Sequence, residues 1–258
     1  MNRRLLITGA GGFLGSRICE YYSNRDGYEA VGVTHRELDI EDFVAVSAFI
    51  KAIRPDYVLH CAAISNTGTC ERNPVLSEKV NVRGTINLAK ACRNAGSRMI
   101  FTSSDQIYNT SHSMEPNREG SEGKPGNVYG RDKKRAEESM LTYLPDAVAL
   151  RLTWMYDAPS RGRAAGQGLL QKLADALKER REVEFPVHDY RGITYVWEVV
   201  RHLEEAMGLP GGVYNFGSEN RYNTFDTARL FLRELAGSDS GGILKRNDER
   251  FASCPRNL

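Results

Sequence analysis

The stretch Arg-Leu-Leu-Ile-Thr-Gly-Ala-Gly-Gly-Phe-Leu-Gly, residues 4–15, decides the fold of this chain. A short apolar run breaks into a turn of small residues, and an amphipathic segment begins at Phe13. In this order of strand, turn and helix, the N–H groups of the helix start bind the pyrophosphate of a dinucleotide. Gly9 permits the sharp turn, Gly12 leaves room for a phosphate, and Gly15 permits close packing of helix and sheet. The stretch predicts a dinucleotide-binding fold, with a plain turn as the alternative.

Strand and helix patterns alternate along the first half of the chain. This alternation predicts the α/β class, with a Rossmann-type doubly wound parallel sheet. We expect residues 1–152 to form the cofactor-binding domain that carries the catalytic residues. Residues 153–258 are expected to form a smaller, mixed α/β substrate lobe that is interleaved with the first domain. The expected helices are 13–24, 40–53 with Asp39 as its cap, 74–95, 128–144, 166–180, 195–207 and 224–235.

Bulk properties limit the classes of function. The chain has 258 residues and a net charge of +2, which gives no reason to expect a nucleic-acid or membrane partner. No apolar run approaches a membrane span and no signal peptide is visible, so a cytoplasmic protein is expected. The five cysteines form no C-x-x-C pair, so we expect reduced thiols and no metal site. They are Cys19, Cys61, Cys70, Cys92 and Cys254.

Two segments carry side chains suited to carbonyl chemistry. Tyr129 and Lys133 are four residues apart, so they are neighbours on one helical face. A nearby ammonium can lower the pKa of a phenol from about 10 by roughly three units, which makes the phenol a usable acid or base. Ser104 follows an expected strand at 98–102, where its hydroxyl could donate to a carbonyl oxygen. The alternatives are a surface Tyr–Lys pair and an ordinary turn serine.

Several motifs together resemble the extended short-chain dehydrogenases/reductases. They are the glycine stretch, Asp39-Ile40, Cys61-Ala62-Ala63, Asn81-Val82-Arg83-Gly84-Thr85, Ser104 and Tyr129-x-x-x-Lys133. Within this family, three further segments resemble the dTDP-4-dehydrorhamnose reductase branch. These are Arg-Glu-Leu-Asp-Ile (36–40), Ser-Ser-Asp-Gln-Ile-Tyr (103–108) and Arg-Leu-Thr-Trp-Met-Tyr (151–156). The ending Cys-Pro-Arg-Asn (254–257) falls where the family has a loop on the substrate side.

The resemblance implies a role for each matching residue. Tyr129 would be the general acid, with Lys133 as its electrostatic helper and ribose ligand, Ser104 as the hydroxyl that positions the carbonyl, and Asn81 as a brace of the site. The implied cofactor-binding residues are Gly9, Gly12, Phe13, Leu14, Gly15, His35, Arg36, Asp39, Ile40, Cys61, Ala62, Ala63, Tyr129 and Lys133. The implied substrate-binding residues are Asp105, Gln106 and Trp154.

Two departures from the branch bear on function. Gln106 stands where the branch usually has Tyr. After the second expected strand, Thr34, His35 and Arg36 replace the acid that binds a ribose hydroxyl, although Glu37 is close. The loss of an acid and the gain of an arginine favour a 2′-phosphate, so we expect NADP(H), with NAD(H) left open.

The sequence therefore predicts an NADP(H)-dependent reductase of a 4-keto nucleotide sugar. Two alternatives remain: a non-catalytic dinucleotide-binding regulatory subunit, like that of methionine adenosyltransferase, and a nucleotide-sugar epimerase. A dehydratase is disfavoured, since the dehydratases that the family resembles use an Asp-Glu pair where this chain has Asp105-Gln106, and an amide is no base. The oligomeric state, a homodimer included, is left open.

Overall fold

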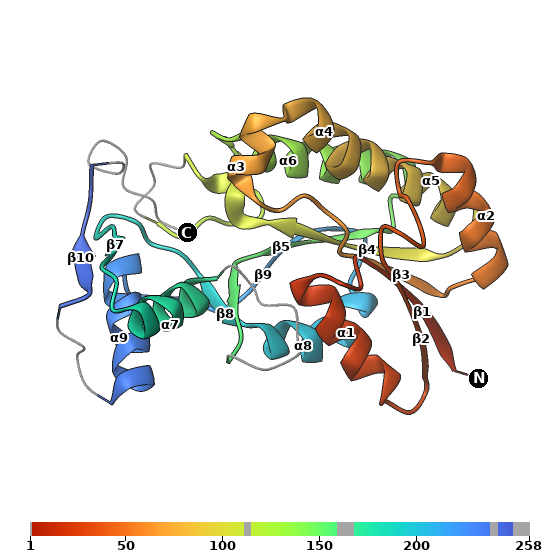
Figure 1. The fold of residues 1–258 in the computed structure, drawn as a ribbon. Coiled ribbons are helices and arrows are strands. Elements are labelled where there is room, and N and C mark those ends of the chain that lie inside the picture. Colours follow the sequence, from red (N-terminus) through yellow and green to blue (C-terminus); the bar gives the residue numbers. More distant parts are fainter. Residues whose placement is uncertain (1, 111–114, 159–167, 238–241, 250–258) are drawn as a thin grey trace.

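The computed structural model describes residues 2–110, 115–158, 168–237 and 242–249. Six parallel strands form the central sheet, in the order β2-β1-β3-β4-β5-β9 (Figure 1). They are β1 (Arg3–Thr8), β2 (Tyr28–Val33), β3 (Tyr57–His60), β4 (Arg98–Ser104), β5 (Val148–Leu152) and β9 (Gly212–Phe216). The expected Rossmann-type parallel sheet is confirmed.

Helices cover both faces of this sheet (Figure 1). One face carries α2 (Phe43–Ile53), α5 (Thr85–Ala95) and α6 (Val128–Tyr143), and the other carries α1 (Phe13–Ser23) and α8 (Val196–Gly208). Each face has its own apolar core, in which strand residues such as Leu6 and Leu5 point to opposite sides. This period of two along a buried strand is what a sheet covered on both faces requires.

The turn between β1 and α1 is as tight as the sequence predicts. Gly9 has a φ of +70°, and a Cβ there would lie 2.7 Å from the backbone nitrogen of Ala62. A Cβ on Gly15 would overlap the carbonyl oxygen of Gly9, so only glycine allows α1 this close to the strand. The two glycines hold the start of α1 at the carboxyl end of the sheet.

Two helices differ from the sequence expectation. The helix expected from residue 40 begins at Phe43, because Asp42 Oδ1 accepts hydrogen bonds from the backbone nitrogens of Val44 at 2.9 Å and Ala45 at 3.0 Å. Asp39 is therefore not its cap. The helix expected over 74–95 is interrupted. A π-helical segment, η1 (Lys79–Gly84), separates α4 (Pro74–Glu78) from α5.

The second half of the chain contributes to both parts of the molecule. β9 pairs with β5 and α8 packs under the central sheet, so both complete the first unit. The smaller lobe has its own core. It is built from α7 (Leu169–Glu179), β7 (Val183–Phe185), α9 (Thr224–Ala236) and β10 (Leu244–Arg246). The pair β6 (Trp154–Tyr156) and β8 (Ile193–Tyr195) lies between this lobe and the sheet. No helix in the described ranges is long and apolar enough to cross a membrane.

Candidate active site

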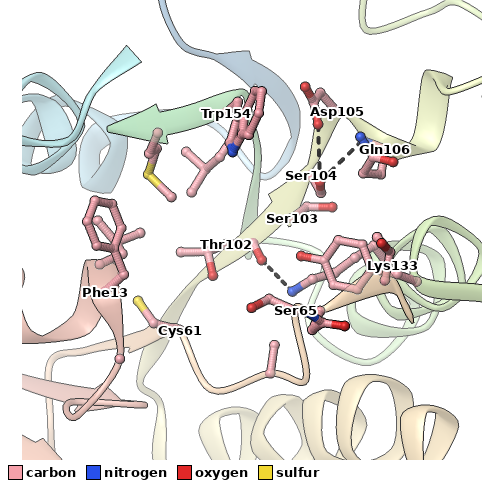
Figure 2. A pocket seen from close by; sticks show the side chains of 18 of the residues that line it. Phe13, Cys61, Ser65, Thr102, Ser103, Ser104, Asp105, Gln106, Lys133 and Trp154 are labelled. Carbon is pink, nitrogen blue, oxygen red and sulfur yellow. Dashed lines mark hydrogen bonds between the residues drawn. The ribbon is translucent and has the colours of Figure 1, made fainter. Parts of the chain in front are cut away.

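A cavity of about 720 Å³ opens at the carboxyl ends of the strands. Figure 2 shows Phe13 and Cys61 on one side of it and Ser104 and Lys133 on another, with Trp154 at a third. The lining includes Gly9, Gly12, Phe13, Leu14, Gly15, Cys61, Ala63, Ser104, Asp105, Gln106, Tyr129, Lys133 and Trp154. The cavity thus brings together the glycine turn and the expected catalytic and substrate-side residues. In open α/β sheets, ligands bind at this edge.

The glycine end of the cavity fits a dinucleotide. Gly12 is the N-cap of α1 and offers no side chain to the free N–H groups of the first turn. Gly12, Phe13, Leu14 and Gly15 line the cavity, so the start of α1 offers a place for an anion there. The glycine turn and the open helix start therefore agree with the cofactor that the sequence predicts.

Five residues expected to bind the cofactor lie outside the cavity lining. They are His35, Arg36, Asp39, Ile40 and Ala62. Arg36 is exposed after β2, whereas Ile40 is 5% exposed and packs in the core. The Glu37 carboxylate accepts hydrogen bonds from the backbone nitrogen and hydroxyl of Thr34, both at 2.8 Å, which lowers its pKa. Glu37 is thus tied to the end of β2, and the adenosine contacts stay predictions.

Lys133 is buried at the floor of the cavity. Its Nζ donates a hydrogen bond to the carbonyl oxygen of Thr102 at 2.7 Å and lies 4.4 Å from the centroid of the Phe101 ring (Figure 2). Removal from water disfavours the ammonium and lowers the pKa of Lys133 to about 8. The side chain therefore still carries a positive charge at neutral pH.

Tyr129 lies in the first turn of α6 and is 9% exposed. Burial raises its pKa, and a hydrogen bond with Ser104 opposes this shift only in part. The expectation that Lys133 lowers the pKa of the free tyrosine is therefore wrong. Desolvation of the phenolate is the largest cause of the raised pKa. The consequence is a phenol that keeps its proton at neutral pH, as a proton donor must.

Ser104 ends β4 and forms the N-cap of the short 3-10 helix η2 (Asp105–Tyr108). Its Oγ accepts a hydrogen bond from the backbone nitrogen of Gln106 at 3.2 Å and donates to Asp105 Oδ1 at 3.3 Å (Figure 2). The hydroxyl thus lies at the cavity wall, close to the phenol of Tyr129. Two hydroxyls from different elements converge where one carbonyl oxygen could lie.

Asn81 lies behind the cavity, in the π-helical segment η1. Its Oδ1 accepts a hydrogen bond from the backbone nitrogen of Ile64 at 2.9 Å, and its Nδ2 donates to the carbonyl oxygen of Ile64 at 3.1 Å. The amide also donates to Ser77 Oγ at 3.2 Å. Asn81 is 1% exposed, so it fixes the loop after β3 from inside and does not line the cavity.

The far end of the cavity combines a buried acid, a cation and an aromatic ring. Asp105 is 7% exposed, and burial raises its pKa to about 6. Arg191 Nε donates to Asp189 Oδ2 at 2.8 Å, and its guanidinium lies 5.4 Å from the centroid of the Trp154 ring. Since Arg191 lines the cavity, this end presents an ordered positive charge beside an aromatic face.

Comparison with known proteins assigns the family. The model of the RmlD substrate binding domain matches residues 3–251. The chain belongs to this family. A dTDP-4-dehydrorhamnose reductase from Mycolicibacterium smegmatis is 30% identical over 93% of this chain and 71% of its own length. Methionine adenosyltransferase 2 subunit beta from Xenopus laevis is 31% identical over 99% of this chain and 78% of its own. The resemblance to the dTDP-4-dehydrorhamnose reductase branch of the extended short-chain dehydrogenases/reductases is confirmed.

Solved structures agree on the fold. The crystal structure of dTDP-4-dehydrorhamnose reductase from Bacillus anthracis, in complex with NADP, superposes with a TM-score of 0.85 at 23% identity. The match covers 96% of this chain and 85% of that one. A UDP-glucose 4-epimerase from Thermotoga maritima, solved with UDP-glucose, reaches a TM-score of 0.82 at 24% identity and covers 95% of this chain and 86% of its own. The same architecture thus serves both chemistries in other proteins.

Sequence reasoning missed several residues that line the cavity. The missed set includes Ile64, Ser65, Asn66, Thr67, Thr102, Ser103, Asn127, Leu152, Thr153, Met155, Gly168 and Arg191. Arg191 had the clearest signal, because it is the only charged residue in this set. The expected substrate-side loop at 254–257 lies outside the described residues, as does residue Cys254.

Proposed function

We propose that this protein reduces the 4-keto group of a nucleotide-linked sugar with NADP(H). One observation carries the proposal: Ser104, Tyr129 and Lys133 meet in a single cavity whose other end is the open start of α1. Family membership and reductase relatives along most of the chain support it. The cavity residues support a carbonyl as the reacting group, because both hydroxyls are donors.

The residues would share the work as follows. Ser104 Oγ and the phenol of Tyr129 hold the carbonyl oxygen, and Tyr129 gives its proton to that oxygen as it becomes an alcohol. A reduced nicotinamide, when bound, supplies the hydride. Lys133 would stabilise the phenolate left behind, because its ammonium lies 5.7 Å from the centroid of the Tyr129 ring. The high pKa of the resting phenol ensures that a proton is present to give.

The far end of the cavity supports an anionic sugar derivative as the substrate. Arg191 supplies a cation for phosphate oxygens, and Trp154 supplies a flat apolar face for a sugar ring. Asp105 would accept a hydrogen bond from a sugar hydroxyl. Outside the cavity, the exposed Arg36 that follows β2 supports NADP(H) as the preferred cofactor, with NAD(H) as the weaker one. A cytoplasmic location remains part of this proposal.

Oxidation of NADPH tests the function directly. With a panel of 4-keto nucleotide sugars, we expect loss of absorbance at the nicotinamide band with at least one substrate. Incubation with a nucleotide hexose alone is the matched negative control, since Gln106 cannot abstract a proton. A 4-keto-6-deoxy product formed without net consumption of NADPH would identify a dehydratase and contradict the proposal.

A regulatory subunit is the second candidate. It is favoured by the 31% and 32% identity to methionine adenosyltransferase 2 subunit beta from two Xenopus species, over 99% and 98% of this chain. The retained Ser104, Tyr129 and Lys133 speak for turnover instead. Co-purification with a methionine adenosyltransferase, together with no NADPH oxidation on any keto-sugar, would favour the regulatory role. An epimerase reading rests on fold likeness alone and predicts interconversion of two sugars with no net NADPH change.

A further inference from the structure

The side chain of Gln106 forms hydrogen bonds within the protein. Its Oε1 accepts hydrogen bonds from Asn127 Nδ2 at 3.0 Å and from Asn109 Nδ2 at 3.4 Å. Gln106 is half-buried at the cavity wall, so these bonds are shielded from water on one side. Gln106 was expected to contact the substrate, but its amide oxygen is hydrogen-bonded to side chains of the protein.

Asn127 connects this oxygen to the helix that carries the acid. It is the N-cap of α6, and its Oδ1 accepts a hydrogen bond from the backbone nitrogen of Gly130 at 2.7 Å. A Cβ on Gly130 would lie 2.5 Å from the carbonyl oxygen of Gln106, so the first turn of α6 rests directly on the backbone of η2. Tyr129 lies in that turn.

The other end of Gln106 holds the second hydroxyl. Its backbone nitrogen donates to Ser104 Oγ at 3.2 Å, in the N-cap of η2 (Figure 2). One residue thus contacts Ser104 through its backbone and the cap of α6 through its side chain. We propose that Gln106 is a positioning residue that, through Asn127, sets the separation between the hydroxyls of Ser104 and Tyr129.

This proposal rests on the proposed reductase function and adds a specific consequence. The carbonyl oxygen must lie within hydrogen-bond reach of both hydroxyls, and a misplacement of about 1 Å can cost on the order of 10² in rate. Loss of the Gln106–Asn127 bond frees α6 to shift relative to β4. Binding of the pyrophosphate at the glycine turn should change little, because the hydrogen bonds of Gln106 and Asn127 lead to Ser104, Asn109 and Gly130, which are outside α1.

Two variants remove the hydrogen bond between Gln106 and Asn127, one by changing the acceptor and the other by changing the donor. Gln106→Met keeps the length of the side chain and removes the acceptor. Asn127→Ser keeps a good helix cap and is too short to reach Gln106. We expect each to lower the rate constant of hydride transfer about 10- to 100-fold in single-turnover experiments with NADPH and a 4-keto nucleotide sugar. The dissociation constant of NADPH should change much less than this rate constant, because the glycine turn keeps its contacts. The double variant should be no slower than the slower single variant.

The single-turnover rate constant separates positioning from a structural role. Partial misfolding lowers the fraction of protein that binds NADPH and leaves the rate constant of the bound fraction unchanged. That result, or rate losses that multiply in the double variant, would overturn the proposal while wild-type turnover keeps the reductase function intact. A wild type that reduces no keto-sugar removes the reductase function instead. Crystal structures of both variants then decide the positioning role, and unchanged separation of the Ser104 and Tyr129 hydroxyls refutes it.

Discussion

Lys133 Nζ lies 5.7 Å from the centroid of the Tyr129 ring, with both side chains buried in one cavity wall. Burial favours the neutral form of each side chain: it lowers the pKa of Lys133 to about 8 and raises the pKa of Tyr129. At neutral pH the pair is an ammonium beside a protonated phenol. This is the arrangement that a proton donor needs before reduction begins.

Removal of the phenol hydroxyl should abolish most turnover. Tyr129→Phe keeps the ring and removes only the proton donor, so kcat should fall by about 10² or more. Titration with NADPH should give an affinity close to that of the wild type, which serves as the control for folding. Near wild-type reduction by this variant would show that the proton comes from another group.

The rate of reduction should decline as the pH rises above about 8. Above the pKa of Lys133 the amine is neutral and no longer stabilises a phenolate, whereas below it the ammonium is present. A pH profile of kcat measures this limb. Lys133→Arg, which keeps a positive charge at all accessible pH values, should move the limb upward in its residual activity. An unmoved limb would assign it to a different group.

Arg36 should set the choice of cofactor. Arg36→Ala removes a charge-assisted hydrogen bond worth about 1.5–3 kcal/mol, so the affinity for NADPH should fall roughly 10- to 100-fold and that for NADH should change little. Arg93→Ala, an exposed arginine at the end of α5, is the matched control and should leave both affinities unchanged. Equal losses for the two cofactors in the Arg36 variant would argue against a 2′-phosphate site.

His60 should make the protein less stable in mild acid. It is fully buried between Thr8 Oγ1 at 2.8 Å and Thr85 Oγ1 at 3.0 Å, and burial lowers its pKa to about 3. Between that value and about 6.5 the unfolded chain binds a proton that the folded chain does not, so stability falls as the pH falls. Between pH 7 and pH 5, the free energy of unfolding falls by about 2 kcal/mol through His60.

Urea unfolding at pH 7 and pH 5 tests the role of His60. Asp105 contributes the opposite slope, because its raised pKa lets the folded state hold the extra proton between about 4 and 6. Comparison of two histidine variants separates the contribution of His60 from that of Asp105. His60→Asn should show a smaller loss between the two pH values than the wild type, and the exposed His202→Asn should match the wild type. Equal losses in all three proteins would mean that His60 does not titrate on unfolding.

The sequence predicted features that depend on neighbours along the chain. Gly9 and Gly15 are local requirements of a strand–turn–helix unit, and Tyr129 and Lys133 share a face by helical spacing. Features that depend on tertiary burial were out of reach. The pKa of Tyr129 depends on how deeply the ring is buried. The role of Asn127 beside the site depends on its hydrogen bond to Gln106, 21 residues away. Asp39 failed as a cap because a second aspartate, Asp42, lies closer to the first helical residue.

During synthesis, β9 is made well after β5, the strand with which it pairs. β5 ends at Leu152 and its partner β9 begins at Gly212, about 60 residues later. The helix α8, whose Val199 and Val200 belong to the same apolar core as Leu150, is also made in that interval. At roughly 5–20 residues per second, the nascent chain exposes an open strand edge and an uncovered apolar face for roughly 3–12 s. A chain released after residue 152, without α8 and β9, should therefore depend on chaperones.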